Sequence, residues 1–208
     1  EDMITIGKKQ KITPIKKLLQ LFKSEVKKSS LNPKFIHHDW FVKYHLEIVE
    51  KIALELCEYY PKVDKNIVLV LVWLHDYEKI IDFKNQYNST HAVGKKKLLE
   101  LGFNKEFIKK AILYVTILDK KSAITKAPIE VQIVSSSDGA SHLIGPFYAI
   151  HWKEQSQQSC EALMKENKRK ALVDWNKKIV LPEVKKAFLS RHKSLLERSG
   201  IFPKKYLS

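Results

Sequence analysis

Apolar residues recur every three or four positions along most of this chain, which is the spacing of amphipathic α-helices. The stretches with this pattern are residues 14–27, 41–59, 91–101, 104–118, 148–178 (with a break expected near Asn167) and 183–199. The loops between them are of modest length. The pattern therefore predicts an all-α fold class.

Two of these helices need comment. Ser89 or Thr90 is expected to cap the helix at 91–101, with His91 in its first turn and Gly102 at its end. Residues 129–134 alternate in a way that also fits a β-strand. Because the rest of the chain is helical, we interpret this segment as a buried helix. It leads to Asp138, which lies among small residues where a ligand can approach closely.

The most apolar stretch is the run of eight residues from Ile67 to Leu74, which continues directly into His75-Asp76. A run of this kind is expected to form a buried helix, with Asp64 as its cap and the His-Asp pair at its far end. A buried carboxylate needs a cation or strong donors. A metal ion would satisfy both residues, and the alternative is a histidine–aspartate hydrogen bond that ends the helix.

A second inward histidine precedes this run. His45 lies three and four residues before Ile48 and Val49, so it falls on the apolar stripe of its predicted helix. The loop to the next helix is short, and the two helices are therefore expected to be antiparallel neighbours. His45 is then either a hydrogen-bonded core residue or a member of the same pocket as His75.

Taken in order, His45, His75, Asp76 and Asp138 offer two imidazoles and two carboxylates. This set suits one divalent metal ion (Mn, Fe, Co, Ni, Zn or Mg) better than calcium. Four ligands drawn from separate helices would leave positions for water, which a hydrolytic metal requires. The predicted metal ligands are these four residues.

This arrangement resembles the HD-domain metal-dependent phosphohydrolases, whose signature is a His, a later His-Asp pair and a distant Asp. The resemblance covers roughly residues 35–150. It rests on segments 45–53 (His-Leu-Glu-Ile-Val-Glu-Lys-Ile-Ala), 74–79 (Leu-His-Asp-Tyr-Glu-Lys) and 137–143 (Ser-Asp-Gly-Ala-Ser-His-Leu). It implies a helical bundle in which these four positions bind the metal. Many members carry a further His in the next helix, which segment 111–115 lacks, and this argues against a two-metal site.

The implied organisation is a basic amphipathic helix at 1–30 packed on the domain, an HD-domain core at 31–150 and a C-terminal helical extension at 151–208. The implied activity is hydrolysis of a small anionic phosphate substrate, such as a nucleotide, by metal-activated water. Whether the chain forms a homodimer stays open. So do two other functions: an HD-type nuclease or RNA-processing factor, and a non-catalytic metal-binding scaffold.

Further residues are assigned roles on this hypothesis. Asp76 binds the metal, and Lys79, one turn beyond it, neutralises charge that develops on the phosphate. Glu78 orients the attacking water or acts as a base. His91 at a helix start, and His38 before the first ligand helix, contact the substrate. The alternatives are an exposed lysine, a solvated acid and loop histidines with no role.

The composition bears on whether nucleic acid or a membrane is a partner. The 208 residues carry a net charge of +15, and of 38 basic residues only Arg169, Arg191 and Arg198 are arginine. Proteins that recognise nucleic-acid bases favour the planar guanidinium group of arginine. The lysines of this chain are spread along almost its whole length. The charge is therefore interpreted mainly as a compositional bias, with nucleic acid as a possible partner. No apolar run reaches the roughly 18 residues that span a membrane. Cys57 and Cys160 are expected to be buried free thiols in a cytoplasmic protein.

Overall fold

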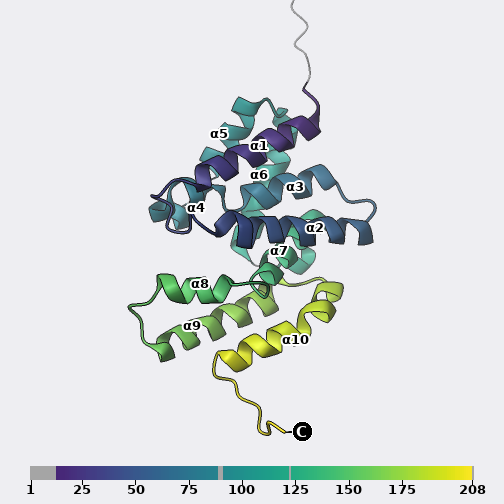
Figure 1. The fold of residues 1–208 in the computed structure, drawn as a ribbon. Helices are drawn as coiled ribbons and strands as arrows, with labels where there is room; N and C mark the ends of the chain where they lie inside the picture. Colours follow the sequence, from purple (N-terminus) through teal and green to yellow (C-terminus); the bar gives the residue numbers. More distant parts are fainter. Residues whose placement is uncertain (1–12, 89–90, 122, 208) are drawn as a thin grey trace, which may run out of the picture.

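The computed structural model describes residues 13–88, 91–121 and 123–207, and this part of the chain forms helices and no strand (Figure 1). The prediction of an all-α fold is thus confirmed for the described residues. The α-helices are α1 (Ile15–Ser30), α2 (Glu47–Tyr59), α3 (Lys65–Leu74), α4 (Tyr77–Ile81), α5 (Ala92–Leu101), α6 (Lys105–Lys120), α7 (Ile129–Ser141), α8 (Phe147–Glu154), α9 (Cys160–Val173) and α10 (Pro182–Arg198). Two π-helical segments, η1 (Val42–Leu46) and η4 (Asp174–Lys178), and two 3₁₀ segments, η2 (Phe83–Asn88) and η3 (Ile124–Lys126), complete it.

Helix α3 lies at the centre of the larger group of helices. It packs against α1, α2, α6 and α7, so nearly all of its apolar residues are buried. This explains why the run reads as apolar on every side. Asp64 caps α3 as predicted, because its carboxylate accepts hydrogen bonds from the backbone N–H groups of Asn66 and Ile67. In turn, α1 lies across α3, α4 and α5, with Leu18, Phe22 and Val26 buried.

Helix α3 ends at the His-Asp pair, as predicted. The helix stops at Leu74, and His75 and Asp76 form the junction between α3 and the short α4. His45 also leaves the regular α-helix, since it lies in the π-helical segment η1 that continues into α2. Single π-helical turns re-aim side chains and are frequent at functional sites. The local irregularities therefore coincide with the residues that carry the proposed chemistry.

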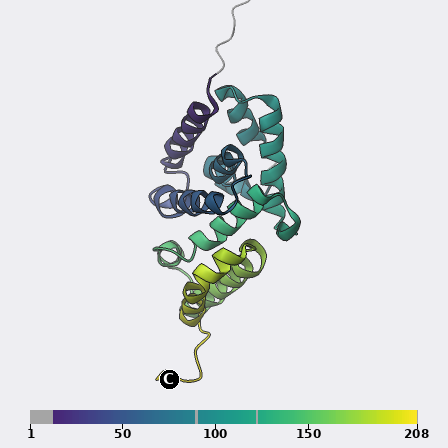
Figure 2. The ribbon, with the colours of Figure 1, turned by 90° about the vertical axis from the view of Figure 1, so that its right-hand side faces the viewer.

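Helix α7 joins the larger group to a lower layer made of α8, α9 and α10 (Figures 1 and 2). It packs against α2 and α3 on one side and against η4 and α10 on the other. Its small residues allow this close packing: a Cβ atom placed on Gly139 would lie 2.9 Å from Cγ1 of Ile179. The predicted helix at 129–143 is confirmed, and it is buried on both faces. The segment after Asp138 is thus pressed against the C-terminal third.

The C-terminal third also differs in detail from the prediction. The expected helix at 148–178 is broken between Glu154 and Cys160 instead of near Asn167. Ser159 caps the new start, since its hydroxyl accepts a hydrogen bond from the N–H of Ala162. Cys160 at this start is exposed, so the expectation that both free thiols are buried holds only for Cys57.

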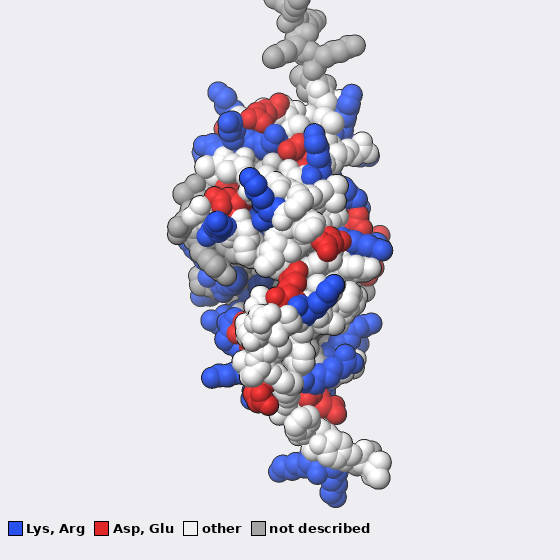
Figure 3. All heavy atoms as spheres, turned by 60° about the vertical axis from the view of Figure 1, so that its left-hand side comes forward, with Lys and Arg blue, Asp and Glu red and all other residues white. Residues whose placement is uncertain are grey.

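The surface carries lysine and arginine over its whole visible face, with acidic side chains between them, and no single basic stripe stands out (Figure 3). This distribution agrees with the interpretation of the charge as a general bias. Across the described residues, no helix combines the length and the apolar character that crossing a membrane requires.

Candidate metal centre

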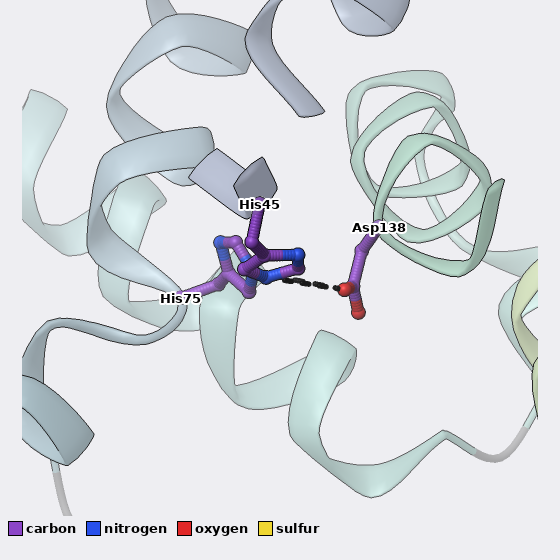
Figure 4. Close-up of side chains that lie close together, drawn as sticks. All are labelled: His45, His75 and Asp138. Atoms are coloured by element: carbon purple, nitrogen blue, oxygen red, sulfur yellow. Dashed lines mark ion pairs between the residues drawn. The ribbon is translucent and has the colours of Figure 1, made fainter. Parts of the chain in front are cut away.

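Three of the four predicted metal ligands, His45, His75 and Asp138, present ligand atoms that all lie within 4.8 Å of one another. Asp76 contacts both imidazoles but is not part of this group. Nε2 of His45 lies 3.2 Å from Oδ2 of Asp76 and 3.7 Å from Oδ1 of Asp138. Nε2 of His75 lies 3.3 Å and 4.0 Å from the same two oxygens. Figure 4 shows the two imidazoles and the carboxylate of Asp138 pointing toward one another from separate segments. Atoms bound to one ion at about 2 Å lie roughly 3–4 Å apart, so this spacing fits a shared ion.

The hydrogen bonds of the imidazoles orient their lone pairs toward the carboxylates. The hydroxyl of Ser141 donates to the backbone O of Asp138 (2.7 Å), so it accepts from Nδ1–H of His45 (3.0 Å). Nδ1–H of His75 donates to the backbone O of Val72 (2.8 Å). His45 therefore presents an unprotonated Nε2, and Nε2 of His75, which is buried without a hydrogen bond, is the position that either a proton or a metal ion can occupy. Two imidazole Nε2 atoms facing carboxylate oxygens fit a divalent cation.

Each carboxylate divides its two oxygens between the imidazoles and a lysine. Asp76 directs Oδ2 at the imidazoles and binds Nζ of Lys79 through Oδ1 at 2.6 Å. Asp138 directs Oδ1 at the imidazoles and binds Nζ of Lys178 through Oδ2 at 2.6 Å. Such contacts to the outer oxygens orient a ligand toward a metal.

The same lysines keep both carboxyl groups ionised. Burial acts to raise the pKa of Asp76, but Lys79 and His75 lower it well below its usual range. Burial is opposed in the same way at Asp138, where Lys178 and the nearby histidines lower the pKa. Two buried negative charges beside two imidazoles are available as metal ligands at neutral pH.

The two histidines differ in their titration. Burial lowers the pKa of His45 below its ordinary value in spite of Asp76 and Asp138, so this ring is neutral near pH 7. Burial also acts to lower the pKa of His75, but the charges of Asp76 and Asp138 outweigh it and raise the pKa to about 8. A metal ion bound at neutral pH would therefore displace a proton from His75.

Two predicted site residues have structural contacts of their own. Glu78 borders the central cavity, and its carboxylate accepts from the N–H of Val93 at the start of α5 (3.2 Å). His91 also borders the cavity, with Nε2 2.8 Å from Oδ2 of Asp119. It occupies the N-cap position of α5 with a left-handed backbone (φ 56°), so its expected place in the first turn was wrong. Ser89 and Thr90, the expected caps, lie outside the described residues.

His38, the predicted substrate contact, does not line the central cavity. Nδ1 of His38 lies 3.0 Å from the backbone O of Phe35, and Nε2 lies 3.0 Å from Oδ1 of Asp39. The neighbouring His37 borders the cavity instead, with Nδ1 2.8 Å from Oε2 of Glu154. The side chains of consecutive residues in this turn point in different directions, which sequence spacing alone did not distinguish.

The sequence did not predict that Asp174, from the C-terminal third, contacts residues of the site. Oδ2 of Asp174 lies 2.8 Å from Nδ1 of His142 and 3.3 Å from Nζ of Lys170. Oδ1 of Asp174 lies 3.5 Å from Nζ of Lys178. Burial and the charge of Lys170 lower the pKa of His142 to about 3. His142 therefore stays neutral, and its Nε2 lies 3.6 Å from Oδ1 of Asp138. The only sequence signal was the four-residue spacing of 170, 174 and 178.

These groups open onto a central cavity of ≈ 730 Å³. Its size is in the range of small-molecule sites. Aromatic side chains of Trp40, Phe41 and Phe147 form part of its wall. Its Lys and Arg residues are Lys79, Lys120, Lys121, Arg169, Lys170 and Lys178, and its Asp and Glu residues are Asp76, Glu78, Asp119, Asp138 and Asp174.

Comparison with known proteins identifies no relative of the chain. No protein-family model, no curated protein and no solved structure matches it. Functional inference therefore starts from the side chains of the cavity and their chemistry.

Proposed function

We propose that the chain is a metal-dependent phosphohydrolase of the HD-domain type. It cleaves a phosphate ester or anhydride of a small molecule by attack of water. The observation that carries this proposal is the convergence of two imidazole Nε2 atoms and a carboxylate oxygen from His45, His75 and Asp138, with Asp76 in contact with both imidazoles. Nε2 of His75 is buried without a hydrogen bond, and a divalent cation that replaces its proton would satisfy that atom.

When bound, one divalent ion would supply a water made acidic enough to yield hydroxide near neutral pH and a positive charge for the phosphoryl oxygens. The protein's own residues do the remaining work. Ser141 and the backbone O of Val72 hold the imidazoles with Nε2 toward the centre. Lys79 and Lys178 hold the carboxylates and place ammonium groups beside the reacting phosphate, where charge develops.

The charge of the cavity supports an anionic substrate. Its lining has six Lys and Arg residues against five Asp and Glu, which leaves one net positive charge when the histidines are neutral. A divalent ion would raise this to three. A phosphate compound with several negative charges would balance it, and Trp40 and Phe147 offer apolar surface for the rest of the molecule. A nucleotide meets both requirements.

A nucleic-acid substrate is the second candidate, and the net charge of +15 favours it. The even spread of basic side chains on the face in Figure 3 gives it less support than a continuous basic track would. This candidate predicts cleavage that is strongly sensitive to salt.

The metal content of purified protein tests the site. Wild type reconstituted with Mn, Co, Ni or Zn should retain about one ion per chain, because four ligands fit one ion. His75→Ala and Asp138→Ala should each retain close to none, as measured by elemental analysis after dialysis. Asp39→Ala is the matched control, since this carboxylate is largely exposed (74%). Equal metal content in all four proteins would eliminate the proposed site.

Phosphate release from a substrate panel tests the activity. The panel contains p-nitrophenyl phosphate, nucleoside mono-, di- and triphosphates, sugar phosphates and a short RNA, each with Mn, Co, Ni and Mg. We expect metal-dependent release from at least one small substrate. Cleavage of RNA alone would favour the second candidate. No turnover by a protein that retains its metal would leave a binding or scaffold function.

A further inference from the structure

A second cavity of ≈ 530 Å³ adjoins the central one. The two cavities share Lys120, Lys121, Arg169 and Val173 in their linings, so they are neighbours. We call the second cavity the basic annex. It lies between the end of α6 and the segment from α9 to Val180. Lys177 lines the basic annex and not the central cavity.

The annex differs from the central cavity in charge. Its described lining has four basic side chains, all exposed, and no Asp or Glu. One of the four, Arg169, is paired with Glu166 outside the lining. Within the described part of the chain, Lys120, Lys121 and Lys177 form no ion pair with a carboxylate. The central cavity is different, since Asp76, Asp138 and Asp174 there each bind a lysine. Cations gathered in a concave surface without acids attract multiply charged anions.

The electrostatic cost of gathering these cations is reflected in the pKa of Lys121. Burial and the nearby charge of Lys178 lower the pKa of Lys121 below its ordinary value. Its backbone is also left-handed (φ 50°), as is that of Ala123 (φ 57°) in the same lining. Such conformations are uncommon in residues other than glycine and gather at ligand sites. A bound anion would offset the electrostatic cost at Lys121.

The other residues of the annex indicate which part of a ligand it accepts. Thr125 and Asn176 offer polar donors, and the lining contains no aromatic residue. Sites that hold successive bases of a single strand use aromatic platforms for stacking. The annex therefore suits a phosphate group better than a base, while the aromatic wall of the central cavity, at Trp40 and Phe147, lies outside the annex lining.

We propose that the basic annex binds a second phosphoryl group of the substrate. The preferred substrate then carries at least two phosphoryl groups, one at the metal centre and one beside Lys120, Lys121 and Lys177. This inference rests on the proposed phosphohydrolase function for the first of these positions. The C-terminal third, through Arg169 and Lys177, thereby selects the length of the phosphate chain.

Titration calorimetry with inorganic tripolyphosphate and orthophosphate tests this proposal. It is done without divalent metal, because tripolyphosphate chelates metal ions. Wild type should bind tripolyphosphate at least about tenfold more tightly than orthophosphate, and Lys121→Met/Lys177→Met should weaken tripolyphosphate about tenfold. Orthophosphate should be weakened less, because a single phosphoryl group contacts fewer of the annex cations than a chain of three. The matched control is Lys168→Met, an exposed lysine on α9 outside both linings.

Equal losses in the double variant and in Lys168→Met, or equal losses for the two anions, would overturn the proposal. So would a loss of affinity for a ten-nucleotide RNA with no loss for tripolyphosphate, which would assign the annex to nucleic acid. His75→Ala should retain tight tripolyphosphate binding, because it leaves the annex intact. Failure of the annex and failure of the metal centre are therefore seen in different variants and different measurements.

Discussion

Asp138→Asn is expected to reduce metal-dependent phosphate release at least about a thousandfold, which corresponds to about 4 kcal/mol of transition-state stabilisation. The substitution preserves the shape of the side chain but removes its charge. Oδ1 of Asp138 faces the imidazoles of His45 and His75, and Oδ2 binds Lys178. A neutral amide would weaken metal binding and leave the ammonium of Lys178 without its closest partner.

The measurement is kcat/KM on the best substrate of the panel, with circular dichroism to check the helical content. Asp39→Asn is the matched control and should keep full activity, because Asp39 lies outside the cavity lining. Asp138→Glu, which keeps the charge, should retain more activity than Asp138→Asn. Activity within tenfold of wild type in a folded Asp138→Asn protein would contradict the assignment of this residue as a ligand.

Features set by local sequence were predicted well. The apolar run of α3 and its cap at Asp64 are written in consecutive residues, and the helix period places His45 inward without any knowledge of the partner helix. The grouping of His45, His75, Asp76 and Asp138 came from order and resemblance, and the geometry groups His45, His75 and Asp138, with Asp76 in contact with both imidazoles. What the sequence could not provide was the separate short helix α4 after the pair, since no side chain caps its start.

Features set by distant packing were missed. Lys170, Asp174 and Lys178 recur every four residues, which is typical of a solvated helix face. They are drawn into the site because α7 packs closely on η4 at Gly139, a contact between segments about 40 residues apart. The break after Glu154 was missed for another reason. The polar segment 155–159 ends in a capping serine, but the apolar pattern continues on both sides of it and obscures this signal.

Asp174→Ala is expected to lower the free energy of unfolding by about 3–5 kcal/mol, the range for removing one partner of a buried charge pair. The carboxylate of Asp174 is 2% exposed and lies within 3.5 Å of Nζ of both Lys170 and Lys178. It also holds Nδ1 of His142 at 2.8 Å. Without it, two ammonium groups and a buried imidazole lose their common acceptor.

Urea unfolding followed by circular dichroism measures this loss. Glu197→Ala, an exposed acid on α10, is the control and should change stability by less than about 0.5 kcal/mol. Asp174→Asn should lie between the two, because the amide can still accept a hydrogen bond but carries no charge. Lys178 keeps its ion pair with Asp138 in this variant, which limits the loss. A change below 1 kcal/mol in Asp174→Ala would mean that water already solvates Lys170 and Lys178, and that Asp174 is not needed to hold the C-terminal third on α7.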